Sequence, residues 1–80
     1  MTTYIATFFS HFGAIRFHKE LRDRGITAKM MPVPRKVSSS CGTCVSYEAD
    51  LPMAECMDED VESIFCAAGD GYELVITFEE

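Results

Sequence analysis

The first ten residues constrain the fold most, because they predict a strand that passes directly into a helix. The segment "TTYIATFF" (Thr2 to Phe9) is rich in β-branched and aromatic residues, which favour a β-strand. Ser10 can then accept a hydrogen bond from the first turn of a helix, and Gly25 can end that helix. We therefore expect a helix over residues 11–24. Its inward face would carry Ala14, Phe17 and Leu21.

Three more segments have the composition of strands. Residues 27–33 ("TAKMMPV") predict a second strand, and Pro32, which has no N–H to donate, places that strand at an edge of the sheet. The alternating residues of "CVSYEA" predict a half-buried third strand over residues 44–49. The last strand is predicted at "YELVITF", residues 72–78.

A second helix is predicted between the third strand and the last one. Apolar residues recur there at helical spacing, with the acidic run "DED" on the opposite side. Pro52 fits only the first turn of a helix, so the helix could begin nearer Asp58. Gly69 would end it. The apolar residues in this pattern are Leu51, Ala54, Met57, Val61, Ile64, Phe65 and Ala68.

The element order β-α-β-β-α-β predicts a ferredoxin-like α+β sandwich, a four-stranded antiparallel sheet with two helices on one face. Its usual strand order, 4-1-3-2, agrees with an edge position for the second strand. A chain of 80 residues, 48% of them hydrophobic, has material for one core, so residues 1–80 are expected to form a single domain. This topology would bring Ser10, the loop from Pro34 to Cys41 and the turn at residues 69–71 to one end of the molecule.

Composition limits the classes of partner. The formal net charge of −6 argues against a nucleic-acid-binding function. No segment approaches the roughly 20 apolar residues that span a bilayer, and the first residues lack the charged start of a signal peptide. We therefore expect no membrane partner and a cytoplasmic protein whose four cysteines are reduced thiols.

The loop "PRKVSSSCGTC", residues 34–44, is the candidate site. A thiolate rather than a thiol attacks sulfur or binds soft metals, so a reactive Cys41 needs groups that stabilise its anion. Gly42 lets the chain turn sharply and leaves the sulfur open, whereas Cys44, at the start of the third strand, is less free to move. The groups expected to stabilise or bind an anion are Ser10, His11, Arg35, Lys36, Ser38, Ser39 and Ser40, with the amino end of the first helix.

Two stretches of the sequence, "YIATFFSHFGAIRFHKEL" and "MPVPRKVSSSCGTCVSYE", resemble the selenium/sulfur carrier-like proteins, which are small bacterial domains. The similarity covers residues 1 to about 50. It implies that Cys41 holds a transient persulfide or perselenide, with no resident cofactor or metal. It also implies a donor such as a cysteine desulfurase or a selenocysteine lyase, and an acceptor protein. Such a carrier is a co-substrate rather than a stand-alone enzyme.

Other interpretations of the Cys-x-x-Cys pair remain open. Disulfide exchange would use Cys41 and Cys44, although the first cysteine of a thioredoxin-like motif begins a helix and this pair leads into a strand. A zinc site would need two more ligands, and Cys56 and Cys66 have unsuitable spacing. Cu(I) carriers of this fold place the motif after the first strand instead. A regulatory binding module, or a homodimer formed through an exposed sheet face, is also compatible with the sequence.

Overall fold

The computed structural model describes residues 1–37 and 39–77, which form five strands, one α-helix and one short 3-10 helix. Ser38 and residue 78, at the end of the predicted last strand, lie outside the described residues. In chain order the elements are β1 (Thr2–Phe8), α1 (His11–Asp23), β2 (Ala28–Pro32), β3 (Thr43–Ala49), η1 (Ala54–Cys56), β4 (Val61–Ala68) and β5 (Gly71–Thr77).

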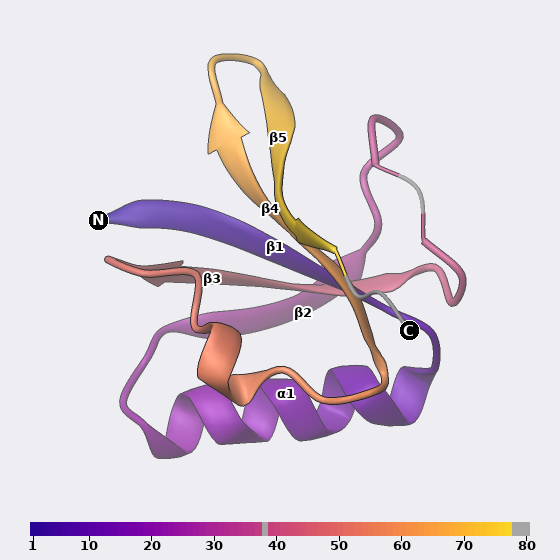
Figure 1. Cartoon of the computed structure of the whole chain (residues 1–80), viewed down its shortest axis with the longest axis vertical. Helices are drawn as coiled ribbons and strands as arrows, with labels where there is room; N and C mark the ends of the chain where they lie inside the picture. Colours follow the sequence, from indigo (N-terminus) through magenta and orange to yellow (C-terminus); the bar gives the residue numbers. More distant parts are fainter. Residues whose placement is uncertain (38, 78–80) are drawn as a thin grey trace.

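The strands form one sheet in the order β2-β3-β1-β4-β5, and every neighbouring pair is antiparallel. The helix α1 lies along one face of this sheet, and the hairpin formed by β4 and β5 projects away from α1 (Figure 1). Pro32 ends β2, which is an edge strand, as its missing N–H predicts. None of the described helices has the length and apolar character that crossing a membrane requires.

The main core lies between α1 and the sheet. Alternate residues of the central strands face the helix, because successive side chains of a strand point to opposite faces. The rings of Phe8 and Tyr47 each pack edge-on against Phe17, with centroid separations of 5.5 and 5.6 Å. The buried members of this core cluster are Tyr4, Ala6, Phe8, Ala14, Phe17, Leu21, Val45, Tyr47, Ala49, Val61 and Ile64.

The opposite face of the sheet is also covered near its centre. Ile5, Thr7 and Cys44 alternate with the residues that face α1, and each is at most 2% exposed. Thr7 donates a hydrogen bond to the carbonyl oxygen of Ser63 at 3.4 Å. Val37, from the loop before β3, is buried as well, and none of these residues belongs to the main core cluster. The loop that carries the candidate site therefore supplies a side chain to the interior of the domain.

The predicted ferredoxin-like sandwich is wrong, because the described chain has five strands and one α-helix instead of four strands and two helices. The segment predicted as a second helix contains η1 and the whole of β4. The first four elements and the last strand lie close to their predicted positions, and β3 lies between β1 and β2 as expected. The error is confined to residues 51–68.

A β-bulge explains why β4 has the spacing of a helix. Thr7 pairs with Ser63 and Phe8 pairs with Val61, so Glu62 has no partner on β1. A bulge inserts one residue and shifts the alternation of the strand by one position. Val61 and Ile64 therefore both join the core, although they are three residues apart. This i, i+3 spacing favoured a helix in the sequence, and the β-branched and aromatic residues of "VESIF" pair as a strand instead.

Candidate functional site

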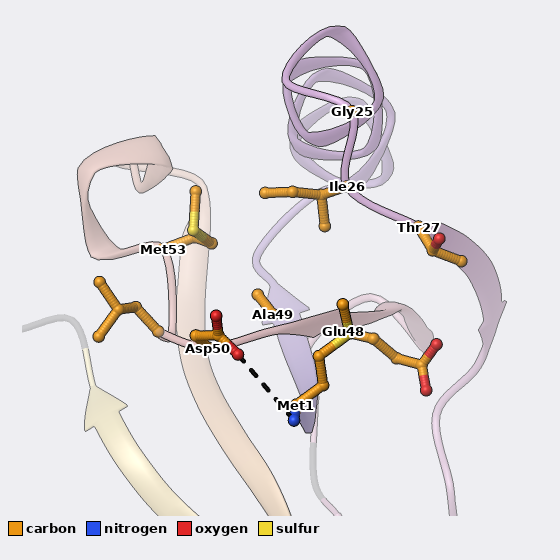
Figure 2. A pocket seen from close by; sticks show the side chains of 9 residues that line it. Met1, Gly25, Ile26, Thr27, Glu48, Ala49, Asp50 and Met53 are labelled. Atoms are coloured by element: carbon orange, nitrogen blue, oxygen red, sulfur yellow. Dashed lines mark ion pairs between the residues drawn. The ribbon is translucent and has the colours of Figure 1, made fainter.

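A pocket of about 320 Å3 lies where α1 is followed by β2 and where β3 ends. Ile26 and Met53 point toward each other across it, and the amino group of Met1 lies 4.0 Å from the carboxylate of Asp50 (Figure 2). Its lining holds no cysteine: it consists of Met1, Gly25, Ile26, Thr27, Glu48, Ala49, Asp50, Leu51 and Met53. Because β3 runs from the cysteine loop to this pocket, the two features lie at opposite ends of one strand.

Two backbone hydrogen bonds shape the loop before β3: one joins its two ends, and the other closes a turn near its start. The N–H of Val33 donates to the carbonyl oxygen of Gly42 at 3.1 Å, and a tight turn is closed by the N–H of Val37 and the carbonyl oxygen of Pro34 at 3.0 Å. Gly42 has a φ of 75°, a left-handed conformation that glycine adopts without the steric cost of a Cβ. The turn of the backbone at Gly42 leaves Cys41 in the loop, whereas Cys44 lies within β3.

Cys41 holds a partly exposed free thiol. Its Sγ lies 3.4 Å from the carbonyl oxygen of Thr43, and its N–H donates to the Oγ of Ser39 at 3.4 Å. Cys41 also packs against the main core cluster, and the residue as a whole is partly exposed. Its thiol is therefore positioned by local contacts in a residue that solvent can partly reach.

Cys44 is fully buried in β3, where its Sγ donates to the carbonyl oxygen of Pro32 at 3.7 Å. Burial, with a smaller contribution from the nearby thiol of Cys41, raises the pKa of Cys44 to about 11. This thiol is consequently protonated at neutral pH. The two cysteines form no disulfide, and their sulfur atoms contact different carbonyl groups.

The serines of the loop connect it to the sheet. Ser39 donates from Oγ to the carbonyl oxygen of Phe8 at 3.3 Å. Ser40 donates from its N–H and from its Oγ to the two carboxylate oxygens of Glu62, at 3.2 and 3.0 Å. Glu62 was not among the predicted site residues, because its segment has the spacing of a helix and a β-bulge has no recognisable local sequence motif. The predicted role of Ser38 falls on a residue outside those described.

The predicted cations are spread over the surface instead of converging on the sulfur. Arg35 is exposed, and no contact within the described part of the chain joins it to Cys41. Lys36 donates from Nζ to the carbonyl oxygen of Asp70 at 2.7 Å, so its ammonium group lies at the turn between β4 and β5. β4 begins beside Phe8 and runs antiparallel to β1 as far as Tyr4. The turn that follows β4 therefore lies away from the end of β1 that leads to Ser10. The charged side chain seen to contact Ser40, the residue before Cys41, is instead the acidic Glu62.

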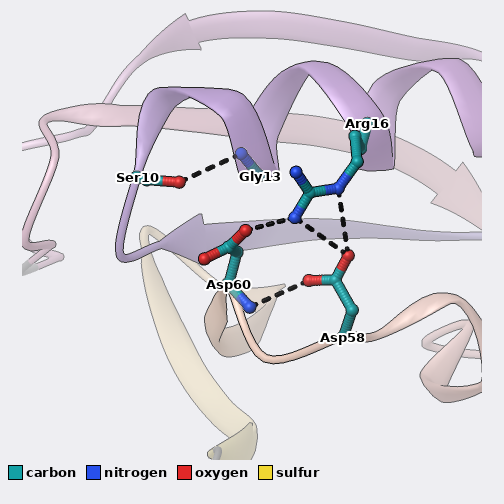
Figure 3. Close-up of polar contacts among 5 residues, drawn as sticks. All are labelled: Ser10, Gly13, Arg16, Asp58 and Asp60. Atoms are coloured by element: carbon teal, nitrogen blue, oxygen red, sulfur yellow. Dashed lines mark hydrogen bonds and ion pairs between the residues drawn. The ribbon is translucent and has the colours of Figure 1, made fainter.

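The amino end of α1 is fixed by a cap and by an ion pair. Ser10 accepts a hydrogen bond from the N–H of Gly13 at 3.2 Å, and Arg16 pairs with both Asp58 and Asp60 (Figure 3). A Cβ on Gly13 would lie only 2.5 Å from the Cβ of Asp60, so the missing side chain allows the segment before β4 to pass close to the helix. Ser10 thus acts as a helix cap here.

His11 is the exposed first residue of α1, and no described contact joins it to the loop. Within residues 1–37 and 39–77, no group of three or more His, Cys, Asp or Glu side chains lies close enough together to hold a metal ion. Cys56 and Cys66 both pack against the main core from separate elements.

Comparison with models of protein families gives a match over residues 3–62 to the family described as "Putative Se/S carrier protein-like". The match extends from β1 to the bulge in β4, so it includes the entire cysteine loop. Searches of curated proteins and of solved structures gave no match. The resemblance inferred from the two sequence stretches is confirmed.

Proposed function

Because the chain belongs to the Se/S carrier protein-like family, we propose that it carries a sulfur or selenium atom on Cys41 as a persulfide or perselenide. The observation that supports Cys41 as the carrying residue is the contrast within the motif, where Cys41 is partly exposed and Cys44 is fully buried. A carrier thiol must be reached by the active sites of other proteins, and loops at the surface allow this access.

Loading is an exchange between sulfur atoms that needs no oxidant. The thiolate of Cys41 attacks the outer sulfur of a persulfide on the donor, R–S–SH, and the S–S bond of that persulfide breaks. The donor leaves as the thiolate R–S⁻, and the carrier gains Cys41–S–SH. Attack by an acceptor thiolate on that outer sulfur transfers the atom onward and restores the Cys41 thiolate. A perselenide follows the same steps with selenium as the outer atom.

The partners of this exchange are a donor and an acceptor protein. The family resemblance implies that the donor is a protein such as a cysteine desulfurase or a selenocysteine lyase. Arg35 within the loop and His11 at the start of α1 are exposed, so both are available to bind an anionic group of a partner. The carrier itself is consumed and regenerated in each cycle, so it acts as a co-substrate.

Thiol-disulfide exchange between Cys41 and Cys44 has less support. The first disulfide would require the buried Sγ of Cys44 to leave its contact with Pro32 and reach Cys41. A thiol whose pKa is about 11 is also a poor nucleophile at neutral pH, because almost none of it is ionised.

Intact-mass measurement tests the carrier proposal. The purified protein is incubated with a cysteine desulfurase and cysteine, and in parallel with a small polysulfide that needs no protein docking. We expect added sulfur that a reductant removes, lost in Cys41→Ser and retained in the matched control Cys44→Ser. Equal loading of both variants would overturn the assignment to Cys41. Failure of the wild-type protein to load from either donor would overturn the carrier function.

A further inference from the structure

We infer that Glu62 is a positioning residue for Cys41, which it holds in place by clamping the preceding residue, Ser40. This inference rests on the proposed carrier function and adds a residue to its site. Glu62 comes from β4, more than twenty residues after the cysteine along the chain, and is only partly exposed.

The clamp has two separate hydrogen bonds. One carboxylate oxygen accepts the backbone N–H of Ser40 at 3.2 Å, and the other accepts its hydroxyl at 3.0 Å. Together they fix both the backbone and the side chain of the residue bonded to Cys41. Hydrogen bonds to an ionised acceptor are stronger than those between neutral groups, so a carboxylate suits this role.

A second attachment supports the first. The Oγ of Ser39 accepts the N–H of Cys41 and donates to the carbonyl oxygen of Phe8. Phe8 is the β1 residue that pairs with Val61, which is next to Glu62, the residue of β4 without a partner on β1. The two residues before the thiol are thus anchored to the two strands that meet at one bulge.

The bulge also leaves Glu62 available for this contact. The bulge leaves Glu62 without a partner on β1. Bulges disrupt the ladder locally and can redirect a side chain, and here the Glu62 carboxylate reaches Ser40. In the described residues no other acidic side chain contacts the loop segment from Ser39 to Gly42, so this attachment depends on one residue.

A fixed thiol matters for transfer between two proteins. The donor must bring its persulfide into line with the Cys41 sulfur, and displacement of a reacting group by about 1 Å can reduce a rate by roughly 100-fold. A small reagent that diffuses freely has no such requirement. Loss of the clamp is therefore expected to slow loading from a protein donor and to leave reaction with a small reagent nearly unchanged.

The test compares Glu62→Ala with Glu62→Gln, which keeps an acceptor oxygen, and with the control Glu73→Ala, which removes an exposed carboxylate from β5. Hydrogen exchange of the Ser40 amide reports the clamp directly and does not depend on the carrier function. We expect exchange to accelerate by about tenfold or more in Glu62→Ala, by a smaller factor in Glu62→Gln, which keeps one neutral acceptor oxygen, and not to change in Glu73→Ala.

Loading from a desulfurase gives the functional measurement. We expect a decrease of about tenfold in rate for Glu62→Ala, rescue to within about threefold by Glu62→Gln, and no change for Glu73→Ala. Ser40→Ala, which removes one of the two bonds, should slow loading less than Glu62→Ala does. The double variant should be no slower than Glu62→Ala alone, because both substitutions break the same contact.

Iodoacetamide labelling separates positioning from unfolding. If Glu62→Ala only unfolded the domain, the buried Cys44 would also become reactive, so we expect it to remain unlabelled. Wild-type exchange at Ser40 or a wild-type loading rate in Glu62→Ala would overturn the inference. If the wild-type protein does not load at all, the carrier proposal fails, and Ser40 exchange alone then decides whether Glu62 holds the cysteine loop.

Discussion

Cys41 and Cys44 are separated by two residues but lie in two different regions of the molecule. Cys41 ends a loop, and part of its side chain is exposed, whereas Cys44 is inside β3 and fully buried. The division falls at Gly42, whose left-handed backbone ends the loop just before the strand begins at Thr43. The exposure of each cysteine in this Cys-x-x-Cys pair therefore depends on where strand pairing begins, and not on the spacing of the motif alone.

The largest expected difference between the two cysteines is in alkylation. At pH 7 a thiol with a pKa of about 11 is ionised to roughly one part in ten thousand, and Cys44 is also closed to solvent. We expect iodoacetamide to label Cys44 at least about 100-fold more slowly than Cys41 in the folded protein, as measured by peptide mass spectrometry. Unfolding in urea should remove the difference. Comparable rates in the folded state would contradict this contrast.

The next effect concerns stability at alkaline pH. The folded-state pKa of Cys44, about 11, lies above its ordinary value of 9.0, so between these values the unfolded chain releases a proton that the folded chain keeps. The stabilisation is complete below pH 9 and is lost as the pH rises toward 11. Between pH 7 and pH 10 the wild type should lose about 1.4 kcal/mol of unfolding free energy more than Cys44→Ala does.

Urea unfolding of both proteins at the two pH values measures this difference. Burial also raises the pKa of Tyr47, which is present in both proteins, so its contribution cancels in the comparison. Cys41→Ala is the matched control and should lose nearly as much stability as the wild type, because Cys41 makes the smaller contribution to the raised pKa of Cys44. Equal losses in the wild type and Cys44→Ala would show that Cys44 does not carry the effect.

The smallest effect concerns the residue that divides the two regions. Replacing Gly42 by alanine imposes a cost of about 1 kcal/mol, because an L-residue is strained at a φ of 75°. Apart from its two chain neighbours, no atom of the described residues lies within 4 Å of the added Cβ, so crowding there adds nothing. Gly71 is the matched control: its φ is not in the left-handed region, and its Cβ position is also open, so Gly71→Ala should be close to neutral. If urea unfolding shows that Gly42→Ala and Gly71→Ala are equally stable, backbone strain at Gly42 does not destabilise the folded protein.

The sequence predicts the parts of this fold that depend on local signals. Ser10 marks the start of α1, Pro32 marks an edge strand, and the alternation of residues 44–49 marks β3. β4 could not be predicted, because its bulge gives Val61 and Ile64 a spacing that a helix also produces. Within the candidate site the two cysteines were visible in the sequence, but the Glu62 contact was not. That contact joins residues 22 positions apart and exists only in the folded sheet.

The bulge position in β4 has a consequence for how this protein can change. Side chains that fill the core are tied to one another by volume, and replacing one of them disturbs the rest. Glu62 is not part of the core cluster and pairs with no residue of β1, so a substitution there removes the contact with Ser40 while the core packing stays the same. Under the proposed carrier function, relatives of this chain would be able to acquire different transfer rates through a single codon, without the compensating changes that an interior position demands.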